Sequence, residues 1–252
     1  MGGAVFCVSN YTISLMKFAI IAAGEGSRLA QEGVDLPKPL VRLNGEPMIE
    51  RLIRIFFDND AEEVAIIVNQ LHPQTEEFVR ELMAQHPQWN IRLVVQTTPS
   101  SMHSFAELAP YLSDAPFCLT TVDTIFREDD FRRYITDFRA ALEVGADGVM
   151  AVTDFIDDEK PLYIGTDDAM NIDGFYDARE PRFRYISGGI YALAPAAIQT
   201  LHRCMNEGQS RMRNFQRGLI VDGLHLKAHL FSKILDVDHA ADIEKAEAFL
   251  RG

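Results

Sequence analysis

The sequence predicts an α/β fold with a doubly wound, mostly parallel sheet and a small antiparallel β-excursion in its C-terminal half. Up to Gly145, short apolar runs alternate with segments of helical periodicity, which is typical of parallel strands joined by right-handed helical crossovers. After Gly145 the strand-like segments follow one another with turn signals between them, which indicates antiparallel pairing. We expect a single domain over residues 17–252, preceded by an extension, residues 1–16, that carries no function.

The first half of the chain provides the parallel part of the expected sheet. Its apolar runs are short and continuous, as strands buried on both faces are. These strands are expected at Lys17–Ala22, Val64–Val68, Ile91–Val95 and Phe117–Val122. Between them apolar residues recur at helical spacing, and a proline suits the first turn of a helix. The helices are expected at Pro47–Phe57, Pro73–Gln85, Ser101–Leu112 and Glu128–Leu142.

The second half is expected to add the antiparallel strands and to close the domain. A turn is expected at Asn171-Ile172-Asp173-Gly174, because Asn, Asp and Gly favour turn conformations. The strands are expected at Val149–Thr153, Tyr163–Ile164, Phe183–Leu193 and Leu226–Leu230. Two closing helices are expected, at Pro195–Asn206 and Ala240–Leu250.

Composition restricts the classes of function. The chain has 252 residues and a net charge of −13, which argues against a nucleic acid or an anionic membrane as partner, since both require a basic face. No apolar run reaches membrane-spanning length. Cys7, Cys118 and Cys204 are widely separated and form no CxxC pair, so neither a disulfide framework nor a zinc site is indicated. We expect a cytoplasmic protein.

A glycine-rich loop follows the first expected strand directly. Residues 22–29 read AAGEGSRL, and LPKPL follows at residues 36–40. Glycines let backbone N–H groups approach a phosphate closely, while Arg28 and Lys38 supply positive charge. A tight strand–loop junction without a ligand is the alternative. The loop lacks the third glycine of a dinucleotide site and the GK[ST] of a Walker A loop.

This loop resembles that of the sugar-1-phosphate nucleotidyltransferases and their relatives that activate phosphocholine or similar acceptors. The family reads approximately AxGxGxRL with a following PK, and this chain has both. The resemblance implies a Rossmann-like fold and transfer of NMP from an NTP to a phosphorylated small molecule, with Mg²⁺ and release of pyrophosphate. It implies that Arg28 and Lys38 stabilise the leaving pyrophosphate. The other implied nucleotide-binding residues of the loop are Ala23, Gly24, Gly26 and Ser27.

Carboxylates for a metal are expected at two places. Asp123 follows the strand ending at Val122, and ligands of open α/β sheets gather at the carboxyl ends of strands. Mg²⁺ takes few protein carboxylates and keeps phosphate and water oxygens as other ligands. By the resemblance, Asp236 or Asp238, just before the closing helix, completes the site. A helix cap is the alternative for Asp123 and Asp238, and the family usually has Gly where Val122 stands.

The base of the nucleotide is expected beside Gln96 and Ser101. The stretch from Gln96 resembles the family pattern QxxxGTA, in which the amide reads the base. Here Ser100 replaces the usual glycine, Ser101 the usual threonine, and Met102 a small residue. For Gln96 an ordinary surface role is the alternative.

The acceptor is expected beside Gly189 and Arg179. Residues 185–191, YISGGIY, are similar to a family strand whose glycine lies next to the acceptor, although a structural bulge would also explain a glycine there. Arg179 falls where some relatives carry a lysine for the acceptor phosphate, and Arg182 and Arg184 compete for that role.

The function expected from these motifs is that of a nucleotidyltransferase acting on an NTP and a phosphorylated acceptor. A nucleotide-sugar-dependent glycosyltransferase shares the sheet and an Asp-x-Asp metal site, but that motif should follow a central strand rather than stand near the end of the chain. A domain that binds nucleotide without turnover is the third possibility. The identity of the NTP, the acceptor and the oligomeric state stay open.

Overall fold

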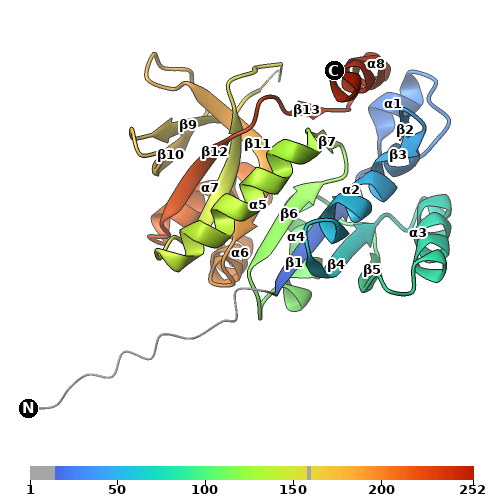
Figure 1. Ribbon diagram of the computed structural model, residues 1–252, viewed down its shortest axis with the longest axis horizontal. Helices are drawn as coiled ribbons and strands as arrows, with labels where there is room; N and C mark the ends of the chain where they lie inside the picture. Colours follow the sequence, from blue (N-terminus) through green and yellow to red (C-terminus); the bar gives the residue numbers. More distant parts are fainter. Residues whose placement is uncertain (1–14, 158–159) are drawn as a thin grey trace, which may run out of the picture.

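The computed structural model describes residues 15–157 and 160–252 (Figure 1). Of the expected N-terminal extension, residues 1–14 lie outside this described part, and Met16 already belongs to the first strand. The first half of the chain forms β1 (Met16–Ala22), α1 (Ser27–Gln31), η1 (Lys38–Leu40), β2 (Arg42–Leu43), β3 (Glu46–Pro47), α2 (Met48–Phe57), β4 (Ala61–Val68), α3 (Pro73–Gln85), β5 (Ile91–Val95), α4 (Ser101–Leu108), η2 (Ala109–Tyr111), β6 (Phe117–Thr121) and β7 (Thr124–Ile125).

The second half forms α5 (Glu128–Glu143), β8 (Gly148–Thr153), β9 (Tyr163–Thr166), β10 (Ile172–Tyr176), β11 (Tyr185–Leu193), α6 (Ala197–Asn206), α7 (Met212–Val221), β12 (Leu226–Leu230), β13 (Leu235–Asp236) and α8 (Ala240–Arg251). The predicted α/β class with a mostly parallel central sheet is confirmed. Every predicted strand and helix is present, with ends that shift by a few residues.

A nine-stranded sheet runs through the described part of the chain. Its main path is β10-β9-β11-β6-β1-β4-β5, and β8 and β12 continue from β11. The pairs β1–β4, β1–β6 and β4–β5 are parallel, whereas β11 pairs antiparallel with β6, β8 and β9. The antiparallel excursion predicted after Gly145 is therefore part of the same sheet, and β11 is the seam between the two halves.

Helices cover both faces of the sheet, because β1 is apolar on both sides. Phe18 and Ile20 belong to one core with α2, α3 and α5, while Ala19 and Ile21 belong to a second core with α4, α6 and α7. In Figure 1, α2 and α5 lie in front of the sheet and α6 lies behind it. This doubly wound arrangement leaves the carboxyl ends of β1, β4, β5 and β6 at one edge.

The turn predicted at Asn171–Gly174 is wrong, because Ile172–Tyr176 forms strand β10. Ile172 and Phe175 are buried, and this burial outweighs the turn preference of the neighbouring Asn, Asp and Gly. The turn lies earlier, where the Asp167 carboxylate accepts hydrogen bonds from the backbone N–H groups of Ala169 and Asn171 at 2.9 and 2.8 Å.

Two helices differ from the prediction. Helix α4 ends at Leu108, and a 3-10 turn that contains Pro110 replaces its expected continuation. Helix α7 was not predicted. Its Gly218 weakens the helical signal, but the structure uses this glycine for close packing, since an added Cβ would lie 2.7 Å from Cys204 Sγ.

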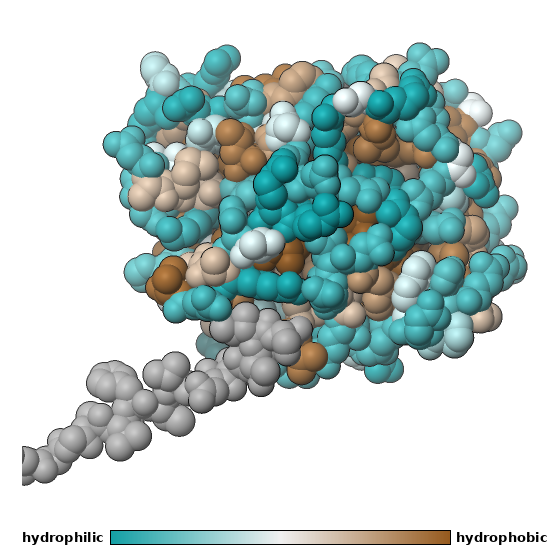
Figure 2. All heavy atoms as spheres, in the orientation of Figure 1, coloured by the Kyte–Doolittle hydropathy of each residue, from teal (hydrophilic) through white to brown (hydrophobic). Residues whose placement is uncertain are grey.

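The visible surface is mainly hydrophilic. Figure 2 shows hydrophilic side chains over most of this face, with hydrophobic ones in separate small groups. Among residues 15–157 and 160–252, no helix combines the length and the apolar character that crossing a membrane requires.

Candidate active site

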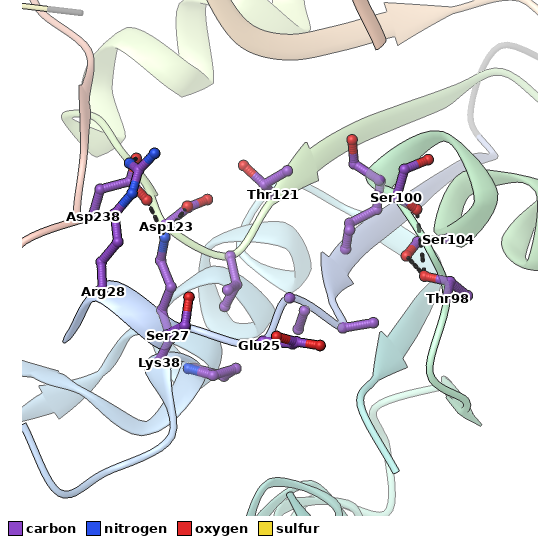
Figure 3. A pocket seen from close by; sticks show the side chains of 18 of the residues that line it. Glu25, Ser27, Arg28, Lys38, Thr98, Ser100, Ser104, Thr121, Asp123 and Asp238 are labelled. Atoms are coloured by element: carbon purple, nitrogen blue, oxygen red, sulfur yellow. Dashed lines mark hydrogen bonds and ion pairs between the residues drawn. The ribbon is translucent and has the colours of Figure 1, made fainter. Parts of the chain in front are cut away.

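A cleft of about 540 Å³, here called the first cleft, opens at the carboxyl ends of the parallel strands. Its lining comes from residues 21–28 at the end of β1 and in the loop that follows it, residues 98–101 and Ser104 after β5, and residues 121–123 at the end of β6, together with Lys38, Pro39 and Asp238. Figure 3 shows Arg28, Lys38, Asp123 and Asp238 at one side of this cleft and Thr98, Ser100 and Ser104 at the other. The glycine-rich loop forms the wall between them.

Gly26 determines how the loop turns. Its φ of 62° is the left-handed conformation that glycine adopts most easily, and it immediately precedes α1. An added Cβ would lie 3.0 Å from Lys38 Cβ, so the loop and the Pro37-Lys38 segment approach closely here. Ala23, Gly24 and Ser27 also line the first cleft, with Arg28 directly after them.

Four charged side chains meet at one end of the first cleft. The Lys38 ammonium donates to Asp123 Oδ2 and, at 2.7 Å, to Asp238 Oδ1. Arg28 Nη1 donates to Asp238 Oδ2 at 3.0 Å. Lys38 is largely buried, with 12% of its side chain exposed, whereas Arg28 is 58% exposed. Burial acts to lower the pKa of Lys38, but the two carboxylates outweigh it and hold this pKa above its usual value.

Pairing of distant segments brings the two carboxylates together. Asp123 lies between β6 and β7, and β7 pairs with β13, so that Asp236 is opposite Thr124. The Val237 N–H donates to the Asp123 carbonyl at 3.2 Å, and Val237 is fully buried. Asp238 is therefore held beside Asp123, whereas Asp236 lines a different cleft.

The Asp123–Asp238 pair suits a divalent cation. Both carboxylates bind the same ammonium nitrogen, so their nearest oxygens are no more than two hydrogen-bond lengths, roughly 6 Å, apart. Across the described residues no group of three or more metal-ligating side chains occurs. Mg²⁺ in nucleotide sites is bound by one or two carboxylates and by phosphate oxygens. These residues fit an ion that arrives together with a phosphorylated ligand.

The opposite end of the first cleft is lined by hydroxyl groups. Thr98 Oγ1 and Ser104 Oγ lie 2.6 Å apart, and both residues line the cleft with Ser100 and Ser101. Met102 is fully buried in the core, so it does not obstruct the cleft. Gln96 is half-buried and is not among the described residues that line this cleft. The sequence signal for Thr98 and Ser104 is the run of hydroxyl residues in TTPSSMHS.

Asn69 ties the two loops of the first cleft together, which sequence reasoning did not detect. Its Nδ2 donates to the Ala23 carbonyl at 3.0 Å, and its Oδ1 accepts from Thr97 Oγ1 at 2.7 Å. Asn69 follows β4 and is only 2% exposed. A polar residue directly after a continuous apolar run was the available signal.

A second cleft of about 440 Å³ adjoins the first. Arg28 and Asp238 line both clefts. The four charged residues Arg28, Lys38, Asp123 and Asp238, here called the charged cluster, therefore lie at the junction of the two clefts. The rest of the second cleft comes from the loop after β8, from β11 and from the segment around β13 and α8. It contains Lys160, Lys245 and Asp236. Lys245 contacts Asp242 at 3.1 Å and Asp157 at 3.4 Å.

Of the two residues expected at the acceptor, Gly189 lies beside the second cleft and Arg179 lies away from it. Gly189 has a φ of 73° in a bulge of β11, and an added Cβ would lie 3.5 Å from Thr124 Oγ1. Its neighbours Ser187 and Gly188 line the second cleft. Arg179 is exposed and lines neither cleft within the described part of the chain.

Curated proteins with similar sequences include cytidylyltransferases and a uridylyltransferase. The chain is 35% identical over 68 residues to the 2-aminoethylphosphonate cytidylyltransferase of Lancefieldella rimae, which covers 27% of this chain and 28% of that protein. It is 25% identical over 252 residues to the UTP–glucose-1-phosphate uridylyltransferase AglF of Haloferax volcanii, covering 94% and 97% of the two chains. For the first three curated relatives, the matched part is between 22% and 28% of their own length.

A solved structure and a family model agree with these sequence comparisons. The inositol-1-phosphate CTP transferase from T. maritima superposes with a TM-score of 0.74 at 17% identity, over 94% of this chain and 98% of that chain. This likeness concerns the fold. The family model of the MobA-like NTP transferase domain matches residues 18–217, which is well over half of the sequence. The chain therefore belongs to the MobA-like NTP transferase domain family.

Proposed function

We propose that the protein transfers an NMP group from an NTP to a small acceptor that carries a phosphate or phosphonate group, and releases pyrophosphate. The observation that carries this proposal is the junction of the two clefts at Arg28 and Asp238. One cleft suits a nucleotide, the other suits an acceptor, and the charged groups stand where the two ligands would meet.

In this proposal, the NTP binds in the first cleft. Backbone N–H groups of the Gly24–Arg28 loop bind the phosphates, and Arg28 and Lys38 neutralise the charge that grows on the leaving pyrophosphate. The base lies toward Thr98 and Ser104, whose hydroxyls can each donate and accept a hydrogen bond.

In this proposal, the metal would lie between Asp123 and Asp238, where the Lys38 ammonium lies in this structure. When bound, Mg²⁺ would neutralise phosphate charge and orient the phosphates for displacement. Lys38 and Arg28 then have to release Asp238, and both become available for the phosphates of the nucleotide.

In this proposal, the acceptor binds in the second cleft. Its anionic end points toward Arg28, and the rest of the molecule lies toward Lys160, Lys245 and Asp236. Its phosphate or phosphonate oxygen attacks the α-phosphorus, the new O–P bond forms, and the bond from the α-phosphorus to the bridging oxygen breaks. Such an oxygen is already anionic at pH 7, so no general base is required. Catalysis consists of positioning and charge neutralisation. The acceptors named for the relatives, an aminophosphonate, glucose 1-phosphate and inositol 1-phosphate, all meet this requirement.

A matrix of substrates tests the proposal. Four NTPs and dTTP are each mixed with sugar 1-phosphates, phosphocholine and 2-aminoethylphosphonate in the presence of Mg²⁺, and pyrophosphate is measured. We expect release only when a nucleotide and an acceptor are both present. Nucleotide binding without release under any combination would instead indicate a non-catalytic nucleotide-binding domain. Formation of nucleoside diphosphate from a nucleotide sugar would indicate a glycosyltransferase.

A further inference from the structure

Glu32 joins α1, which carries Arg28, to the segment that carries Asp238. It caps the C-terminal end of α1, the helix that begins directly after the glycine-rich loop. Its Oε1 lies 2.6 Å from His239 Nδ1, and its Oε2 accepts from the Ala240 N–H at 2.7 Å. A single carboxylate therefore binds the first residue of α8 and the residue before it. Asp238 directly precedes His239 in the sequence.

Two other contacts of Asp238 are ones that the proposed reaction has to break. Arg28 and Lys38 bind Asp238 in this structure, but both turn to the nucleotide phosphates in the proposed function. Strand β13 and the buried Val237 hold this segment on the side before Asp238, whereas Glu32 holds it on the side after Asp238. Glu32 lines neither cleft. A bound nucleotide therefore does not require the Glu32 contact to open.

We propose that Glu32 is a positioning residue that holds Asp238 at the metal position once Arg28 and Lys38 have turned to the nucleotide. This inference rests on the proposed function. The carboxylate acts through α8: it satisfies an N–H at the helix N-terminus and fixes His239, so that Asp238 stays opposite Asp123 without help from the two cations.

The other end of α8 provides a matched control. The Asn44 N–H donates to Glu247 Oε1 at 2.9 Å, so Glu247 also binds α8 to the N-terminal half of the chain. Glu247 lies nine residues beyond Asp238, however, and lines neither cleft. Loss of Glu247 weakens the attachment of α8 without freeing the segment that carries Asp238.

Calorimetric binding of the NTP, without acceptor, tests the inference. The affinity of the nucleotide is measured in EDTA and in Mg²⁺ for the wild type, Glu32→Ala, Glu32→Gln and Glu247→Ala. We expect Glu32→Ala to bind nucleotide in EDTA as the wild type does, but to lose about 10-fold of the tightening that Mg²⁺ gives, as removal of a residue that orients a metal ligand does. Glu32→Gln keeps an acceptor for the Ala240 N–H and should lose less, about 3-fold, and Glu247→Ala should keep the full tightening.

Full Mg²⁺ tightening in both Glu32 variants would overturn the inference, and so would an equal loss in Glu247→Ala. If Glu32→Ala fails to fold, Glu32→Gln carries the same test, because it preserves the shape of the side chain. A wild-type protein that binds no NTP, or whose affinity Mg²⁺ leaves unchanged, would overturn the proposed function itself. The two failures are thus distinguished by the behaviour of the wild type.

Discussion

The first cleft takes most of its lining from loops that each follow a parallel strand. The second takes most of its lining from the loop after β8, a bulge of the antiparallel strand β11 and the C-terminal segment. Loops after neighbouring parallel strands converge whatever their sequence, because the strands end at one edge. The second cleft has no such common geometry. The shape of the second cleft depends on the conformations of the loop after β8 and of the β13–α8 segment, which line it together with β11.

In the proposed function, this difference separates the roles of the two clefts. The glycine-rich loop and Asp123 directly follow parallel strands of the sheet, which suits a nucleotide common to many reactions. The second cleft is lined by lysines, aspartates and apolar side chains on segments outside the parallel half of the sheet. The names of two sequence relatives give different acceptors, an aminophosphonate and glucose 1-phosphate.

The largest effect should come from Asp123, which belongs to the first cleft. Asp123→Asn keeps the shape of the side chain and removes the charge, so we expect turnover to fall about 1000-fold while nucleotide still binds in EDTA. Pyrophosphate release and calorimetric binding measure the two quantities. Asp236→Asn, two residues before Asp238 but in the second cleft, should change mainly the acceptor KM. Equal loss of turnover in both variants would remove the distinction between the clefts.

Lys38 should come next, with effects on both activity and stability. Lys38→Met should lower kcat/KM about 100-fold. It also leaves Asp123 without a cation and Asp238 with Arg28 alone, so we expect the free energy of unfolding to fall by about 2 kcal/mol, partly restored by Mg²⁺. Lys17→Met is the control, because Lys17 is equally buried and binds Asp114 at 2.7 Å far from either cleft. In thermal melts it should lose stability without any response to Mg²⁺; a response there would contradict the assignment of the cluster.

A smaller and more selective effect is expected in the second cleft. Lys245→Ala should raise the acceptor KM about 10-fold and leave the NTP KM unchanged, because Lys245 lines only that cleft. Arg251→Ala removes a cation from the same helix outside the cleft and should change neither constant. Steady-state kinetics with each substrate varied in turn provides the measurement. A change in the NTP KM for Lys245→Ala would mean that the two clefts do not act separately.

The smallest effect concerns the link between loops of the first cleft. Asn69→Ala removes the contacts to Ala23 and Thr97, so we expect the NTP KM to rise about 3- to 5-fold and the free energy of unfolding to fall by about 1–2 kcal/mol. Urea denaturation and initial rates measure these changes. An unchanged NTP KM would show that the loop after β1 holds its conformation without Asn69.

The sequence predicted the parallel half of the sheet well, because hydrophobic burial there follows a simple pattern. The strand β1, for example, is apolar on both faces and ends at the glycine-rich loop. Prediction was weaker where tertiary contacts outweigh local preference. Strand β10 contains turn-forming residues that are held in a sheet by Ile172 and Phe175, and α7 contains a glycine that its packing against α6 requires.

The candidate site shows the same division. Arg28, Lys38, Asp123 and Asp238 stand in recognisable positions of the sequence, and the structure brings them together. Which of Asp236 and Asp238 faces Lys38 could not be decided, because side chains two residues apart in an extended segment share a side. Glu32 and Asn69 lie outside any motif. Their roles arise from contacts with residues 207 and 46 positions away.

The separation between Lys38 and Asp238 also has a consequence for the newly made chain. They lie 200 residues apart, so at typical elongation rates Asp238 is added roughly 10–40 seconds after Lys38. Strands β1, β4, β5 and β6 are complete long before that time. On the ribosome, Lys38 can pair only with Asp123, and the cluster at the junction of the clefts stays incomplete. A nascent chain can therefore form the parallel half of its sheet early, but it completes its charged centre only when Asp238 has been added.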